Sequence, residues 1–223
     1  MVVGEFTNQS LVLEYQKVSS DQLNQTINQF SSILIPSYIR NEIEFAKAMP
    51  EEVANDFMLK SLFQNLSTDP KETNWVEFEQ KVTDVLNNFF KTMDWGKHSD
   101  QQDKHIFVTI KNTSTNKLTG VIQFLSTPKF AKNHVKAALY GITPEFIGSK
   151  LELILMSSIF KINTQTQRIL VHTRSTNQQA ISNYINWGFK HLPSQSPSWS
   201  ELEYLSDQSD YLQTAAAKTI ISK

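Results

Sequence analysis

The chain has 223 residues, and its 21 Lys and Arg against 22 Asp and Glu give a formal net charge of −1. Balanced charge argues against a nucleic-acid partner, and the lack of Cys excludes disulfides, thiolate metal sites and a cysteine nucleophile. No apolar run approaches the roughly 18 residues of a membrane span, and no signal-peptide pattern is visible. We therefore expect a cytoplasmic protein that binds neither nucleic acid nor a membrane.

The first part of the chain is predicted to be mainly helical after one short strand at residues 11–15. Ser19 or Ser20 can cap the helix that follows, and Pro36 is expected to end it because proline lacks the N–H that a helix interior needs. A second helical piece is expected at residues 41–48.

Two more helix starts carry proline in the first turn, where its missing N–H costs nothing. Pro50 precedes two acids, which favour the positive end of the helix dipole. Asp69 precedes Pro70, and Glu72 is spaced for a capping box. The second of these starts predicts an amphipathic helix that runs to about Thr92.

After residue 105 the pattern changes to strands, expected at residues 106–110, 118–125 and 135–143. The third alternates, with apolar side chains at odd positions and polar ones at even positions. One of its faces should therefore be covered, and the other should line water or a site.

An apolar helix is expected at residues 151–162, followed by a buried strand at 169–171. Asn177 stands where a helix N-cap belongs, and Gly188 is placed to end that helix in a left-handed conformation. Two short strands at residues 190–192 and 199–205 should follow, and the chain from Tyr211 reads as a terminal helix or a frayed tail.

The helix that Asn177 caps carries a specific spacing. Its members are Asn177, Ala180, Tyr184, Gly188 and Phe189. This resembles the segment N-x-x-A-x-x-x-Y-x-x-x-G-F of the GNAT superfamily of acyl-CoA N-acyltransferases. The alternative is an ordinary amphipathic helix with an Asn cap, one Tyr and a Gly stop, which many α/β proteins contain.

The resemblance implies an α/β (α+β) fold, with a mixed, mostly antiparallel central sheet flanked by helices and an enlarged helical N-terminal region. Residues 1–104 would supply the first strand and that helical region, residues 105–205 the acyltransferase core, and residues 206–223 a C-terminal tail. We expect one continuous structural domain. The implied function is an acetyl-CoA-dependent N-acetyltransferase, in which the amine acceptor attacks the acyl group directly in a ternary complex. The protein could act as a homodimer.

The family's phosphate-binding loop, Q/R-x-x-G-x-G/A, is poorly matched. Aligned without a gap, Lys150 and Glu152 take its two glycine positions. An alternative alignment keeps Gly148 but places charged Glu145 and Lys150 at the other key positions. Side chains there would crowd a phosphate, although Lys150 offers a compensating cation. Gly148 is equally compatible with an ordinary turn. The expected cofactor contacts in this loop are Gly148, Ser149 and Lys150.

The resemblance also assigns roles along the strand and the helix. Tyr184 would protonate the departing thiolate, while Asn177 and Ala180 would contact the cofactor. A strand N–H near Ile142 or Thr143 would meet the tetrahedral oxygen. A core or surface tyrosine is the alternative for Tyr184.

The general base is less clear, because residues 134–143 contain no carboxylate. His134 is the first candidate since histidine titrates near neutral pH, with Tyr140 and Lys136 beside it; a surface histidine is the alternative. No spacing of His, Asp or Glu resembles a zinc site, so no metal is expected. The altered loop and the missing carboxylate also suit a second function, a catalytically inactive binding protein with this fold and an eroded CoA site.

Overall fold

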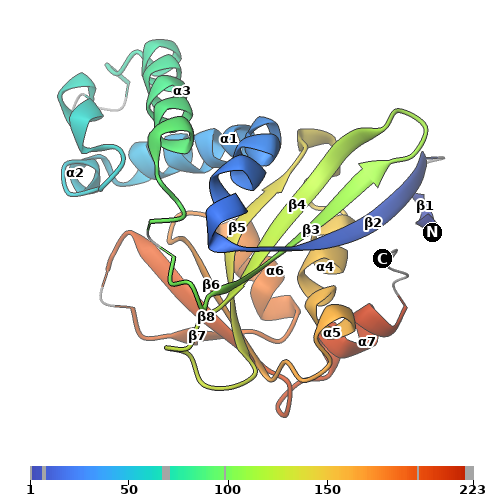
Figure 1. The fold of residues 1–223 in the computed structure, drawn as a ribbon. Helices are drawn as coiled ribbons and strands as arrows, with labels where there is room; N and C mark the ends of the chain where they lie inside the picture. Colours follow the sequence, from blue (N-terminus) through green and yellow to red (C-terminus); the bar gives the residue numbers. More distant parts are fainter. Residues whose placement is uncertain (1, 7–8, 67–70, 98, 195, 219–223) are drawn as a thin grey trace.

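A mixed sheet forms the middle of the molecule, and it is antiparallel except where β5 runs beside β6 (Figure 1). This computed structural model describes residues 2–6, 9–66, 71–97, 99–194 and 196–218. The eight strands lie in the order β1-β2-β3-β4-β5-β6-β8-β7. Their bounds are β1 Val2–Phe6, β2 Gln9–Val18, β3 Lys104–Asn112, β4 Lys117–Ser126, β5 His134–Ile142, β6 Arg168–Arg174, β7 Lys190–Leu192 and β8 Trp199–Leu205. The predicted fold class is confirmed.

Helices cover both faces of the sheet, because alternate strand residues point to opposite faces. Phe107 packs with the N-terminal helices, whereas its neighbour Val108 packs against the helices of the C-terminal half. The longer helices are α1 Leu23–Ala48 and α3 Trp75–Thr92 on the first face, and α4 Lys150–Ser157, α6 Gln178–Asn186 and α7 Tyr211–Ala217 on the second. The short ones are η1 Ser20–Gln22, α2 Pro50–Val53, η2 Lys60–Asn65, η3 Pro144–Phe146 and α5 Ile159–Ile162.

Helix α1 corrects one prediction, since it continues through Pro36 for 26 residues. Buried side chains lie on both sides of the proline, among them Leu34 and Phe45, which are fully buried. The hydrophobic contacts on both sides therefore outweigh the one hydrogen bond that proline removes. The two expected N-terminal helices are one.

Two other predicted helices have different bounds in the structure. Helix α3 begins at Trp75, where the Asn74 side chain accepts a hydrogen bond from the Glu77 N–H at 3.3 Å. The expected cap at Asp69 lies outside the described residues. The predicted helix 151–162 divides at Ser158, whose hydroxyl donates to the Leu155 carbonyl at 2.6 Å and so competes with the helical pattern.

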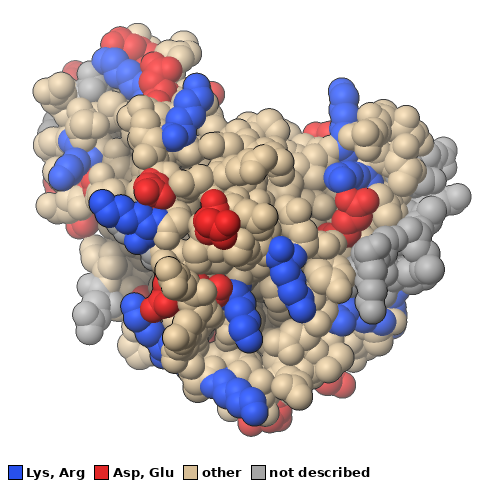
Figure 2. Space-filling model, viewed as in Figure 1, with Lys and Arg blue, Asp and Glu red and all other residues tan. Residues whose placement is uncertain are grey.

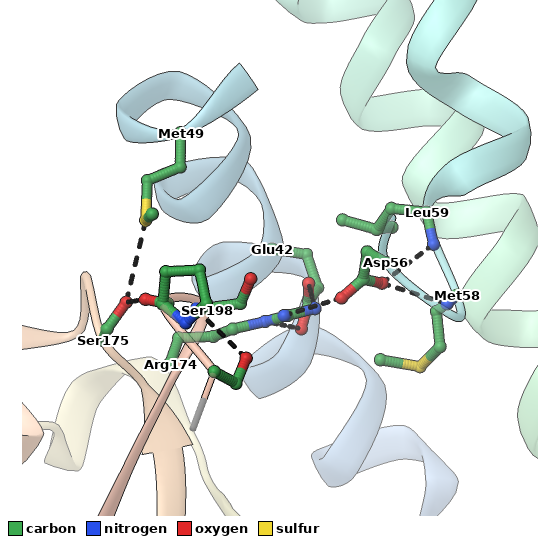
Figure 3. Close-up of polar contacts among 10 residues, drawn as sticks. Glu42, Met49, Asp56, Met58, Leu59, Arg174, Ser175 and Ser198 are labelled. Carbon is green, nitrogen blue, oxygen red and sulfur yellow. Dashed lines mark hydrogen bonds and ion pairs between the residues drawn. The ribbon is translucent and has the colours of Figure 1, made fainter. Parts of the chain in front are cut away.

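Arg174, at the end of β6, is the centre of a buried ionic cluster that joins the helical N-terminal region to the sheet (Figure 3). Its guanidinium pairs with Glu42 of α1 at 2.5 Å and with Asp56, in the loop after α2, at 2.7 Å. It also lies between the rings of Phe45 and Trp199, at 4.1 and 4.2 Å from their centroids. Fork-shaped pairing and ring stacking both require arginine rather than lysine.

The second carboxylate of this cluster is itself held in place. Asp56 accepts the main-chain N–H groups of Met58 and Leu59, each at 3.0 Å. Burial raises the pKa of Glu42, and the charge of Arg174 opposes that rise. The loop after α2 and the middle of α1 are thus tied to the end of β6 by groups that are buried.

Charge is evenly distributed on the face that Figure 2 shows, where basic and acidic side chains alternate over the described part of the surface. Among the described residues, no helix combines the length and apolar character that crossing a membrane requires. The described His, Asp and Glu residues also form no group of three that could hold a metal ion.

Replacement of Arg174 by Met should remove about 3–5 kcal/mol from the free energy of unfolding, because Glu42 and Asp56 would remain buried without a cation. Arg168→Met is the matched control on the same strand. Arg168 pairs with Glu203 at 2.7 Å but is 29% exposed, so its loss should cost about 1 kcal/mol or less. Denaturant unfolding measures both, and equal losses would contradict the structural role of the Arg174 cluster.

Candidate functional site

Strands β5 and β6 pair only over their first four residues and then part. The parallel register joins residues 134–137 to residues 168–171. Beyond it, β5 stays on β4 as far as Ile142, and β6 stays on β8 as far as Arg174. An opening in the sheet therefore begins after Ala137 and Val171.

Helix α1 lies across this opening and contacts both strands within six residues. The Ser37 hydroxyl donates to the Ile142 carbonyl and accepts the Ile142 N–H, each at 3.1 Å. Five residues later, Glu42 holds Arg174 at the end of β6. Helix α1 therefore pairs with the main chain of β5 at Ile142 and holds the end of β6 through the Arg174 side chain.

A cavity of about 610 Å³ occupies the opening. Strands β5 and β6 and helices α1, α4 and α6 all contribute to its wall. The residues used below are Lys136, Ala138, Tyr140, Glu152, His172, Asn177, Ala180, Asn183, Tyr184 and Glu201.

The main-chain N–H that points into this opening belongs to Tyr140. The Thr143 N–H donates to the Thr119 carbonyl of the β4 side at 2.9 Å, so alternation directs Gly141 toward β4 and Tyr140 away from it. The Ile142 N–H also points away but is taken by Ser37. The two amides proposed from the sequence, Ile142 and Thr143, are therefore already paired. The Tyr140 amide was not among the candidates, because its direction depends on strand pairing.

Helix α6 has the local geometry that the sequence predicts. The Asn177 side chain accepts the Ala180 N–H at 3.1 Å and donates to Asn41 of α1 at 3.0 Å. Gly188 has φ +91°, and Phe189 is buried with its ring 5.3 Å from that of Tyr184. Asn177, Ala180 and Tyr184 all reach the cavity wall.

The Tyr184 phenol keeps its proton at neutral pH. Burial, followed by the charge of Glu152, raises the pKa of Tyr184 above its ordinary value of 10.0. The same two causes raise the pKa of Tyr140, whose hydroxyl is buried. The cavity thus presents two neutral phenols around one carboxylate.

That carboxyl group, Glu152, lies in the first turn of α4, directly after the loop where a phosphate site was expected. Gly148 has φ +75°, and the Ser149 hydroxyl caps α4 by accepting the Leu151 N–H at 3.2 Å. Glu152 lies against the Gly148 N–H and accepts a hydrogen bond from the Asn183 side chain at 2.9 Å. The loop amide therefore already faces a carboxyl group of the chain itself, while Lys150 is exposed.

The histidines of β5 and β6 differ in whether they line the cavity. His134 begins β5 and does not line the cavity; burial and then the charge of Arg168 lower its pKa. His172 does line it, with its Nε2 3.8 Å from the Glu201 carboxylate. Burial and then the charge of Lys136 lower the pKa of His172 below 6.5, so it is neutral at pH 7. In the sequence, His172 could have been found as a candidate only from its position on the strand that precedes Asn177.

Several solved structures resemble the chain at low identity. A PaiA N-acetyltransferase from Thermoplasma acidophilum in complex with coenzyme A shares 17% identity over 86% of this chain and 98% of its own, with a TM-score of 0.47. A spermidine N-acetyltransferase from Vibrio cholerae in complex with CoA and spermine shares 13% identity over 90% of this chain and 98% of its own, with a TM-score of 0.42. A putative acyl-CoA N-acyltransferase from Klebsiella pneumoniae shares 16% over 55% and 85%, also at 0.42.

No protein-family model matches the chain, and no curated protein matches it in sequence. TM-scores below 0.5 at these identities establish neither a shared site nor a shared activity. The properties of the cavity therefore rest on the contacts described above.

The protonation of Glu152 should appear in the pH dependence of stability. Burial raises its pKa from 4.5, so the folded protein holds a proton that the unfolded chain has released. The stability that this proton contributes is fully present below pH 4.5. It is lost as the pH rises through the pKa that Glu152 has in the folded protein. Relative to Glu152→Gln, the wild-type free energy of unfolding should therefore fall as pH rises through that window.

Urea unfolding of both proteins between about pH 4 and 8 measures this difference. Glu145→Gln removes an exposed carboxyl from the same loop and should follow the wild type. Parallel curves for the wild type and Glu152→Gln would contradict the burial argument.

Proposed function

We propose that the chain is an N-acyltransferase of the GNAT type, which takes acetyl-CoA as co-substrate and an amine as acceptor. The observation that carries this proposal is the parting of β5 from β6 beside the helix capped by Asn177. A parted strand leaves main-chain groups, here those of Tyr140, to pair with the amides of an extended pantetheine arm. The sequence spacing from Asn177 to Phe189 supports the same conclusion independently.

The cavity residues fit the chemical step. The amine must be neutral to attack the thioester carbon, and His172 in its neutral form can accept the proton that the amine loses. As the C–N bond forms, the Tyr140 N–H is the strand donor available to the tetrahedral oxygen. When the C–S bond breaks, the Tyr184 hydroxyl can donate its proton to the leaving thiolate. Glu201 would favour the imidazolium that forms at His172.

A second function, a binding protein without transferase activity, is favoured by one specific contact. Glu152 lies against the Gly148 N–H, where a transferase of this type would need room for phosphate. A fixed carboxylate repels phosphate, although protonation would weaken that repulsion. Binding and turnover measurements separate the two functions.

Calorimetric titration with acetyl-CoA should show saturable binding that strengthens about fivefold in Glu152→Gln, because removing the carboxylate removes roughly 1 kcal/mol of repulsion. Glu145→Gln again serves as the control and should bind like the wild type. Pantetheine lacks the pyrophosphate, so its affinity should not change in Glu152→Gln. No heat at millimolar acetyl-CoA in the wild type and in Glu152→Gln would contradict the acyltransferase proposal.

Replacement of His172 by Gln should lower kcat/KM by about 100-fold or more, since a general base would be lost. In the wild type the acidic limb of the pH profile should lie below 6.5, because a lowered pKa keeps His172 neutral to lower pH. Thiol release from acetyl-CoA with a panel of primary amines measures both. His191→Gln changes an exposed histidine outside the cavity and should leave the profile unchanged; an unaltered acidic limb in His172→Gln would exclude His172 as the base.

A further inference from the structure

A second cavity, of about 640 Å³, lies between the helical N-terminal region and the chain that leads into β8. Residues of α1, α2, the loop after α2 and α3 form one wall, and residues 196–199 form the other. Leu139 of β5 contributes from the sheet. Most of its lining residues belong to the enlarged helical N-terminal region.

Aromatic rings dominate the first wall. The rings of Phe89, Phe90 and Trp95 contact one another and that of Tyr38 contacts Phe90, with centroids 5.5–5.8 Å apart and mostly edge to face. Phe57 packs on Phe89 at 6.2 Å yet remains 72% exposed. An exposed ring over an aromatic cavity offers apolar surface to a bound molecule.

The charges in the wall are all of one sign. Glu52 and Asp56 line this cavity, and no Lys or Arg lines it among the described residues. Asp56 forms an ion pair with Arg174, whereas the half-buried Glu52 side chain has no partner among the described residues. One carboxylate beside several ring faces attracts a single cation, because the face of an aromatic ring carries negative potential.

The two cavities adjoin. Tyr38, Ser196 and Trp199 line both of them. Leu139 reaches the second cavity, while its neighbours Ala138 and Tyr140 reach the first. A molecule in the aromatic cavity therefore lies next to the opening between β5 and β6.

We propose that the aromatic cavity binds the acceptor, a primary amine carried on one apolar, ring-sized body. This inference rests on the proposed acyltransferase and adds the class of its amine. The apolar body would contact Phe57 and Phe89, and the ammonium would pair with Glu52 until it loses its proton. An extended polyamine fits less well, because its further cations would find no free carboxylate in this wall.

Calorimetry without any CoA tests the proposal with three probes. They are 2-phenylethylamine, its neutral isostere 2-phenylethanol, and spermidine as a ring-free polycation. The wild type should bind 2-phenylethylamine saturably and about fivefold or more tightly than either other probe. Phe57→Ala and Glu52→Gln should each weaken it about fivefold, with Glu52→Gln removing the preference over 2-phenylethanol.

Two neighbours serve as matched controls, since neither lines the cavity. Phe63 is 42% exposed and Glu51 is exposed, so Phe63→Ala and Glu51→Gln should bind 2-phenylethylamine like the wild type. Unchanged affinity in both cavity variants, or tighter binding of spermidine, would overturn the proposal. If acetyl-CoA binds and 2-phenylethylamine does not, this inference alone fails; if only the amine binds, the acyltransferase proposal fails and the amine site stands.

Discussion

The arrangement of the whole site depends on helix α1, which contacts both β5 and β6 where the two strands part. Two parallel strands that part would leave main-chain groups without partners, which is costly inside a protein. Ser37 supplies both a donor and an acceptor to Ile142, and Glu42 fixes Arg174 at the end of the other strand. These residues lie within two turns of one helix, so a single rigid element keeps the strands apart.

This constraint has consequences on both sides of the sheet. On one side it leaves the Tyr140 main-chain groups beside α6 and its neutral Tyr184 phenol. On the other it fixes the loop after α2 through Asp56, and this loop carries Phe57 into the aromatic cavity. At the first cavity, the Glu152 carboxyl group lies against the Gly148 N–H, so a ligand that reached this amide would have to displace it.

Features set by neighbouring residues were predictable from the sequence. The Asn177 cap and the left-handed Gly188 depend on residues at the two ends of one helix, and the structure has both. The sheet class followed from the resemblance to the GNAT superfamily. The prediction that Pro36 ends the helix was wrong, because packing on both sides of a proline is a tertiary effect that local propensity does not include.

The site itself was less accessible to sequence reasoning. Arg174, Glu42 and Asp56 are distant in the chain and carry no common motif, so their pairing is visible only in three dimensions. The direction of the Tyr140 amide depends on which β5 residues bond to β4, and a shift of one residue would reverse it. Glu152 was recognised as an obstacle to phosphate, but its contacts with Asn183 and the two phenols were not.

The state of the Tyr140 amide tests the account most directly. The chain has six tyrosines, so ¹⁵N-tyrosine labelling gives six amide signals, and Tyr140→Phe identifies the relevant one. In the free protein this amide should exchange rapidly with solvent, and saturating acetyl-CoA should shift its resonance and slow its exchange. An amide already protected in the free protein, or one unaffected at saturation, would contradict the parted strands as the cofactor site.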